Sequence, residues 1–271
     1  MKIALLVPGR AARYEVCLLP ILQKTNHDID LFMSINDNED CEYYDNMKKN
    51  LSKWLKNIRF ESYKIPEPFI FDVEFNKSLD FHHQIIDGKE VPYNQMSMYY
   101  NAFMAYKMAT DYEDKQDIKY DIYMRFRVDI CNSQIPEILE PIDKDELKLY
   151  CVVPNCDMTA LAKHKVRVIS DAWAWSNRKT MAIYCDTYNY VLSQLAITNG
   201  KYLVHYESGI TDIIYDNKIP IIYKSIHYNL DRNRRIFETN TNTKLAPIKG
   251  SLSPVDIKTL SNFNLPVDPF I

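Results

Sequence analysis

The residues best suited to chemistry stand at the end of one apolar segment in the middle of the chain. Residues 120–130 alternate apolar and polar side chains and end in an acidic turn at Asp129, and this period of two predicts a β-strand. Open α/β sheets bind their ligands at the carboxyl ends of strands, where Asp129 is expected. A carboxylate there could coordinate Mg²⁺ or Mn²⁺ between the two phosphates of a diphosphate; the alternative is a residue that only caps the turn.

Two arginines precede Asp129 in the same segment. Guanidinium groups form bidentate hydrogen bonds to phosphate, so Arg125 and Arg127 could both bind an anion. Arg127 is the better candidate because it lies nearer the end of the expected strand. The alternative is that both are solvated strand charges or partners in internal salt bridges.

A second group of candidates follows the first expected strand, residues 2–7, in the turn that begins at Pro8. Gly9 would let the backbone approach a ligand closely, and Arg10 and Arg13 would offer charge to a phosphate. A plain turn with exposed arginines is the alternative interpretation.

The second expected strand, residues 29–35, ends at Asn36 and Asp37, which could bind a base or a ribose. The carboxyl ends of parallel strands gather at one edge of a sheet. We therefore expect Asn36 and Asp37 to border one cavity with Gly9, Arg10 and Asp129.

Residues 97–130 join a helix without Gly or Pro to the strand that ends near Asp129. Its Tyr-Glu helix end, Tyr-Asp strand and Arg-x-Arg-x-Asp ending resemble GT-A-fold nucleotide-sugar glycosyltransferases related to the WavE-like lipopolysaccharide enzymes. In this resemblance Asp129 occupies the last position of the metal-binding Asp-x-Asp motif, and Arg127 stands where the first carboxylate would be. The resemblance implies a GT-A-like (Rossmann-like) mixed sheet flanked by helices and a donor linked to UDP, GDP or dTDP.

The same resemblance suggests further site residues. Gln95 and Tyr99 would face the donor, and Asp171 would be the general base for inversion at the sugar, with Glu207 as second choice. His227 would join Asp129 in binding Mn²⁺ or Mg²⁺. From their own chemistry, Trp173 and Trp175 could stack on an acceptor sugar, although core packing is the commoner fate of tryptophan.

Composition narrows the function classes. A net charge of −3 and a pI near 6.1 give no pull toward nucleic acid, and no segment approaches the roughly 20 apolar residues of a membrane span. The five glycines form neither GxGxxG nor a phosphate loop, and the six cysteines include no CxxC pair, which disfavours a zinc site or disulfide framework. We expect a cytoplasmic protein with reduced thiols.

The pattern of elements predicts one domain of 271 residues. Residues 1–131 would bind the donor, residues 132–230 the acceptor, and residues 231–271 would form an irregular tail. Expected helices are 15–23, 42–58, 99–113, 177–195 and 207–217, and expected strands are 2–7, 29–35, 59–65, 120–130, 147–153, 169–175 and 219–226. The expected function is metal-assisted, inverting glycosyl transfer to a carbohydrate; the alternatives are a nucleotidyltransferase and a non-catalytic protein that binds carbohydrate or nucleotide sugar.

Overall fold

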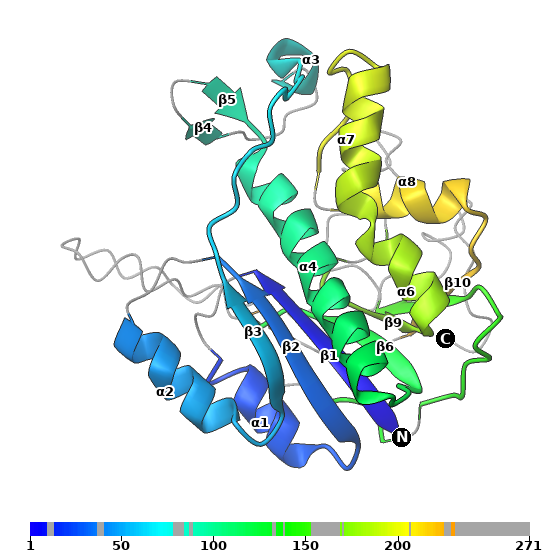
Figure 1. The fold of residues 1–271 in the computed structure, drawn as a ribbon. Coiled ribbons are helices and arrows are strands. Elements are labelled where there is room, and N and C mark those ends of the chain that lie inside the picture. The colour runs from blue at the N-terminus through cyan, green and yellow to red at the C-terminus, as the bar shows by residue number, and fades with distance from the viewer. Residues whose placement is uncertain are drawn as a thin grey trace.

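The computed structural model is built around one mixed β-sheet with helices on both faces (Figure 1). It describes residues 1–9, 14–36, 41–77, 84–86, 89–131, 134–137, 139–152, 169, 171–205, 207–224 and 229–230. The α/β class and the mixed sheet flanked by helices that the sequence predicted are confirmed.

The sheet has seven strands in the order β10-β8-β9-β6-β1-β2-β3. Their bounds are β1 Lys2–Gly9, β2 Asp28–Ile35, β3 Leu55–Phe60, β6 Ile122–Phe126, β8 Leu149–Val152, β9 Trp173–Ser176 and β10 Ile221–Lys224. Strand β1 pairs in parallel with β2 and β6, whereas β9 runs antiparallel to both β6 and β8. Two small antiparallel sheets pair β4 Gln84–Ile86 with β5 Lys89–Val91, and β7 Ile130–Cys131 with β11 Asn229–Leu230.

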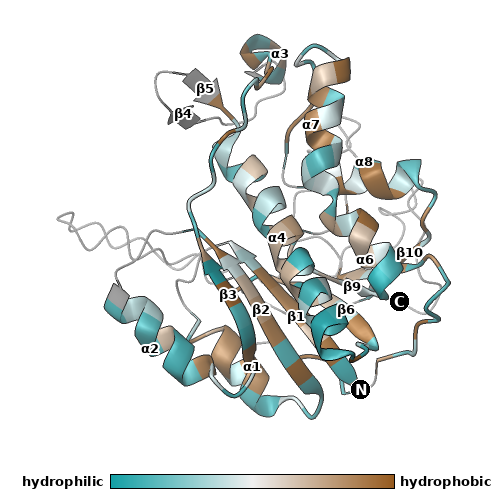
Figure 2. Cartoon of the chain, viewed as in Figure 1, coloured by the Kyte–Doolittle hydropathy of each residue, from teal (hydrophilic) through white to brown (hydrophobic). Residues whose placement is uncertain are grey.

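Helices cover the two faces of the sheet unequally (Figure 1). The helices are α1 Leu18–Lys24, α2 Cys41–Leu51, α3 Val73–Lys77, α4 Tyr93–Gln116, α6 Arg178–Cys185, α7 Thr187–Ile197 and α8 Ser208–Asp216. Side chains of α1 and α2 form one core with Leu5 and Val7, while α4, α6, α7 and α8 form a second core with Ala4 and Leu6. Strand β1 is therefore apolar on both sides, which is typical of parallel strands buried on both faces, and most of its length is coloured hydrophobic in Figure 2.

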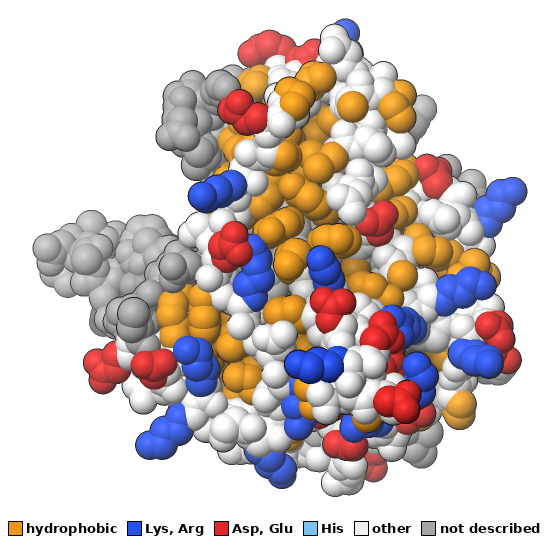
Figure 3. Space-filling model, viewed as in Figure 1, with side chains coloured by type: hydrophobic (Ala, Val, Ile, Leu, Met, Phe, Trp, Pro, Cys, Tyr) orange, Lys and Arg blue, Asp and Glu red, His pale blue; other side chains and the backbone are white. Residues whose placement is uncertain are grey.

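Helix α4 is the longest described element, at 24 residues. It contains no Gly or Pro that would interrupt its hydrogen bonds, and it ends where Asp117 takes a left-handed conformation with φ of 50°. Its packing against β1 and β2 places its first turns beside the carboxyl ends of those strands. On this face, hydrophobic side chains gather around α4 and α7, and charged side chains are densest lower down (Figure 3).

Several predicted boundaries are wrong. The helix predicted over 42–58 ends at Leu51, and β3 begins at Leu55, so the predicted strand over 59–65 lies too late. The single helix predicted over 177–195 is two helices, because the chain turns at Asp186, which closes α6 and precedes α7. Strand β6 ends at Phe126, earlier than the predicted strand.

The order β6-β1-β2-β3 has a consequence for ligand binding. From β1 the chain adds β2 and β3 on one side, and β6 then returns to the other side. Such a reversal leaves a crevice outside the carboxyl ends of the strands, where ligands of open α/β sheets bind. The reversal lies between β1 and β6, so the fold points to the edge that holds Gly9 and the residues after Phe126.

Candidate functional site

An antiparallel strand brings the central acidic and basic residues together. Phe126, the last residue of β6, pairs with Trp173, the first residue of β9. The backbone N–H of Arg127 then donates to the carbonyl of Ala172 at 3.0 Å. Asp171, which precedes β9, consequently lies beside Arg127 at the carboxyl edge of the parallel strands.

Arg127 binds two carboxylates from different segments. Its Nε and Nη2 donate to the two oxygens of Asp129 at 2.9 and 2.7 Å, and its Nη1 donates to Oδ2 of Asp171 at 3.0 Å. Burial opposes the charge of Arg127, but Asp171 and Asp129 outweigh it and raise the guanidinium's pKa above its usual value. The pairing is bidentate toward Asp129, which is the strongest arrangement of these two groups.

Arg125 lies within β6, two residues before Arg127, and is 1% exposed. Its Nη2 lies 4.0 Å from Oδ2 of Asp171, so Asp171 faces two guanidinium groups. Burial alone would raise the pKa of Asp171, but Arg127 and Arg125 outweigh it and hold that pKa below its usual value. We call Arg125, Arg127, Asp129 and Asp171 the carboxyl-edge cluster.

A second set of polar groups adjoins this cluster through helix α4. The hydroxyl of Tyr99 donates to the carbonyl of His205, whose Nδ1 lies 3.1 Å from Oε2 of Glu207. Burial raises the pKa of Tyr99, and the nearby charges of Glu207 and Asp171 raise it further. Tyr99 is thus within electrostatic range of both carboxylates that the sequence singled out as base candidates.

The first strand ends at Gly9, at the same edge of the sheet. Gly9 has φ of +108°, a conformation that L side chains rarely adopt, and no described atom lies within 4 Å of the position its Cβ would take. The backbone N–H of Asn36 donates to the carbonyl of Gly9 at 2.9 Å, which ties the ends of β1 and β2 together. Pro8 stands beside Ser34 in the parallel register. The backbone at Gly9 therefore leaves room for a ligand to approach closely.

The side chain of Asn36 is held against helix α4. Its Nδ2 donates to Oγ of Ser97 at 2.8 Å, and its Oδ1 accepts from Nδ2 of Asn101 at 2.9 Å. Oγ of Ser34 donates to Oδ1 of Asn101 at 2.8 Å. This network fixes the first turns of α4 on β2, and Gln95, 6% exposed, lies in the same turns. A nucleotide contact by Asn36 or Gln95 stays a prediction.

The two tryptophans lie in the core. Trp173 and Trp175 are 0% and 3% exposed. The ring of Trp175 stacks on Tyr150 at 5.6 Å between centroids, and Trp173 meets Phe126 edge-on at 5.0 Å. Both rings are covered by neighbouring aromatic side chains, so this packing gives no support to their expected stacking on an acceptor sugar. Both tryptophans are packed in the core, which was the alternative interpretation.

Four expected site residues cannot be placed. Arg10, Arg13, Asp37 and His227 lie outside the described residues. Among the described candidates, Asp171 contacts the Arg127–Asp129 pair, and Tyr99 contacts the segment that holds Glu207. Gly9 ends β1, the strand that pairs with β6. His205, which contacts both Tyr99 and Glu207, was missed because a lone histidine two residues before a glutamate matches no ligand or catalytic spacing.

The described residues do not fit the divalent cation that the family resemblance implies. Both oxygens of Asp129 already accept hydrogen bonds from Arg127, and Asp171 is bound by the same guanidinium. A metal ion bridging these carboxylates would have to displace Arg127 and stand beside Arg125. Within the described ranges, no group of three or more His, Cys, Asp or Glu side chains is placed to hold a metal.

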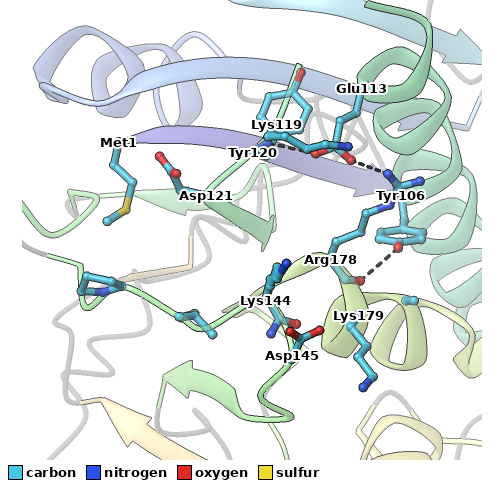
Figure 4. Close-up of a pocket in the computed structure, with 14 residues that line it drawn as sticks. Met1, Tyr106, Glu113, Lys119, Tyr120, Asp121, Lys144, Asp145, Arg178 and Lys179 are labelled. Carbon is cyan, nitrogen blue, oxygen red and sulfur yellow. Dashed lines mark hydrogen bonds and ion pairs between the residues drawn. The ribbon is translucent and has the colours of Figure 1, made fainter. Parts of the chain in front are cut away.

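A cavity of about 980 Å³ lies at the opposite, amino-terminal edge of the sheet. Figure 4 shows Met1 and Asp121 on one side of it and Glu113, Tyr106 and Arg178 on the other. Glu113 accepts from the backbone N–H of Tyr120 at 3.0 Å and from Nη1 of Arg178 at 2.7 Å. Glu113 and Arg178 thus bind each other in the wall of the cavity, which is remote from the edge where strand order predicts a ligand.

No protein-family model matches this chain, and no curated protein matches it. Among solved structures, the chain is similar to a nucleoside-diphosphate-sugar pyrophosphorylase from Vibrio cholerae RC9 at 10% sequence identity. That similarity covers 83% of this chain and 91% of the other, with a TM-score of 0.38, too low to bear on function. No described helix is both long and apolar enough to cross a bilayer.

Proposed function

We propose that this protein transfers a sugar from a nucleoside-diphosphate donor to a hydroxyl group of a glycan acceptor. The observation that carries the proposal is that the reversal of strand order between β1 and β6 coincides with the carboxyl-edge cluster and with Gly9, beside whose Cα no described atom would meet a side chain. The strand order and the charged side chains thus point to the same edge of the sheet, which is where an α/β sheet is expected to bind its ligand. The resemblance of residues 97–130 to GT-A glycosyltransferases supports the same class.

The parts of the donor can be assigned along this edge. The nucleoside would lie over the ends of β1 and β2, with close approach at Gly9, and the diphosphate would lie toward Arg127. Transfer needs positive charge where the leaving diphosphate develops negative charge. Arg127 offers a guanidinium that is 30% exposed in its side chain, whereas Arg125 is enclosed.

The acceptor would approach from the side of Glu207. In the transfer step, the acceptor oxygen forms a bond to the anomeric carbon while the bond from that carbon to the phosphate oxygen breaks. The nucleoside diphosphate leaves with the bonding electrons, and the acceptor proton passes to a carboxylate base. This inverts the configuration of the sugar.

The surroundings of the two base candidates differ. Asp171 is paired with Arg127, and its pKa is lowered, whereas a base works best with a pKa near the operating pH. Glu207 contacts His205 instead of a guanidinium. We therefore propose Glu207 as the base, oriented by His205, and Asp171 as the residue that positions Arg127.

A donor screen tests this proposal. Purified protein would be incubated with UDP-, GDP- and dTDP-sugars and a panel of glycan acceptors, with and without Mn²⁺, and release of nucleoside diphosphate would be measured. We expect acceptor-dependent release from one donor class and its loss in Glu207→Gln. Nucleotide binding without turnover by any pair would favour the non-catalytic alternative, and release of pyrophosphate from nucleoside triphosphate and sugar phosphate would favour a nucleotidyltransferase.

A further inference from the structure

We propose that the guanidinium of Arg127 takes the place of the divalent cation, so that the donor diphosphate binds without a metal. This inference rests on the proposed function for the identity of the ligand. It replaces the Mn²⁺ or Mg²⁺ expected from the family resemblance. Its evidence is the set of contacts that Arg127 makes at the carboxyl edge.

Arg127 occupies the position that a bridging cation would need. Its guanidinium lies between Asp129, in the turn after β6, and Asp171, before β9, and contacts both within 3.0 Å. A cation shared by these carboxylates would require the same space between them. The two segments are joined by the arginine, so the site is assembled without a metal ion.

Charge favours the same assignment. Arg125 and Arg127 balance Asp129 and Asp171, and Arg125 and Asp171 have side chains only 1% and 8% exposed. A divalent cation added here would leave two excess positive charges in a largely buried place, which is costly without further anions. A diphosphate needs a positively charged side chain that can turn toward it. Of the two arginines, Arg127 is the accessible one.

Exposure shows which contact a phosphate would replace. The side chains of Arg127 and Asp129 are 30% and 23% exposed, whereas Asp171 stays enclosed. An incoming phosphate would compete with Asp129 for the bidentate face of Arg127, since both are anions with paired oxygens. Asp129 is then a resident anion that holds Arg127 in place until the donor arrives.

This assignment makes a prediction opposite to that of a metal site. A metal-ligating Asp129 would be required for nucleotide binding, so Asp129→Asn would weaken it. If Asp129 competes with phosphate, Asp129→Asn strengthens nucleotide binding severalfold in the presence of EDTA. Arg127→Gln weakens it by about tenfold or more, as expected for a lost charged hydrogen bond, and Arg127→Lys falls between because it keeps the charge but not the bidentate geometry.

The experiment combines two titrations. UDP, GDP and dTDP would be titrated by calorimetry in EDTA and in Mn²⁺ into wild type, Asp129→Asn, Arg127→Gln and Arg127→Lys. Mn²⁺ alone would be titrated by electron paramagnetic resonance into wild type and Asp129→Asn. Arg178→Gln is the matched control, because Arg178 also binds two carboxylates but lies at the other edge. Circular dichroism melts would show that each variant is folded.

We expect equal nucleotide affinity in EDTA and Mn²⁺, no Mn²⁺ bound to wild type, and unchanged affinity in Arg178→Gln. Mn²⁺ bound by wild type and lost in Asp129→Asn would overturn the inference, as would nucleotide affinity raised tenfold by Mn²⁺. If none of the three nucleotides bound to wild type, the proposed function would fail, and the Mn²⁺ titration would still decide the cation assignment.

Discussion

Two clusters in this protein share a composition, an arginine bound to two carboxylates, but differ in how completely their polar groups are satisfied. At the amino edge, Arg178 binds Glu113 at 2.7 Å and Asp114 at 2.6 Å, and the hydroxyl of Tyr123 donates to Glu113 at 2.6 Å. We call these four residues the amino-edge cluster. At the carboxyl edge, Arg127 binds Asp129 and Asp171 in a similar way.

The difference lies in the buried atoms. Every oxygen of Glu113, which is 2% exposed, accepts a hydrogen bond from a fixed protein group. In the carboxyl-edge cluster, Nε and Nη1 of Arg125 are buried and have no hydrogen-bond partner among the described residues. A buried donor left unsatisfied costs about 1–3 kcal/mol. Among the described residues, the carboxyl-edge cluster carries this cost and the amino-edge cluster does not. The comparison indicates that the same residue types are fully paired at one edge and leave unpaired donors at the other, where we propose that a ligand binds.

The largest expected effect is on turnover. Glu207→Gln removes the proposed base, so turnover should fall by about 10²–10⁴-fold with donor affinity nearly unchanged. Steady-state kinetics and nucleotide titration would measure this. Asp171→Asn would be measured in parallel. If turnover were lost in Asp171→Asn and normal in Glu207→Gln, the base would be Asp171.

The next largest effect is on stability and belongs to the amino edge. Glu113→Gln leaves Arg178 and the hydroxyl of Tyr123 without the charged acceptor they share. The carboxylate is buried but the Arg178 side chain is 40% exposed, and a hydrogen bond to a charged group contributes about 1.5–3 kcal/mol. Urea unfolding would give this loss. Asp114→Asn is the control and should leave the unfolding midpoint nearly unchanged, because that carboxylate is exposed. A stable Glu113→Gln protein that had lost nucleotide binding would break the comparison.

A smaller effect depends on acid. Because the folded protein lowers the pKa of Asp171, this carboxylate contributes stability above its unfolded pKa of about 3.9, and the contribution is lost as pH falls through the lower folded value. The difference in unfolding free energy between wild type and Asp171→Asn should therefore shrink below about pH 4. A difference that stayed constant down to pH 2 would show that Asp171 acts through packing and not through its charge.

The smallest expected effect on stability appears only at alkaline pH and comes from tyrosines near the amino edge. Burial raises the pKa of Tyr106 to about 12, and burial together with Glu113 raises the pKa of Tyr123 further. A raised tyrosine pKa costs stability as pH rises above the unfolded value of about 10. Tyrosinate absorbance from these residues should appear together with unfolding above pH 10, and Tyr123→Phe should weaken that dependence. Absorbance that rose well before unfolding would mean that the cluster opens locally.

The sequence predicted the elements with strong periodicity and missed what depends on contacts between distant residues. Helix α4 and strand β1 could be predicted, because an uninterrupted helical pattern and a short apolar run have few alternatives. The bond between Arg127 and Asp171 could not, since those residues are 44 positions apart and meet only because β9 runs antiparallel to β6.

Two further misses have the same origin. The helix expected over 42–58 ended early because β3 must begin at Leu55 to pair with Leu31 of β2. The tryptophans were expected at an acceptor surface, yet the position of β9 inside the sheet encloses them. Residue type and spacing identified the acidic and basic candidates, but only the sheet decides which of them face one another.

Helix α4 joins the two clusters mechanically. Tyr99, near its start, contacts the segment that holds Glu207, and Glu113, near its end, belongs to the amino-edge cluster. The two residues are 14 positions apart along the helix, a rise of about 21 Å. A tilt of about 3° at the anchored end would move Tyr99 by about 1 Å, a displacement on the scale that costs enzymes large factors in rate. Under the proposed function, a substitution that tilts α4 at Glu113 would therefore lower turnover through the Glu207 segment and leave nucleotide binding at Arg127 unchanged.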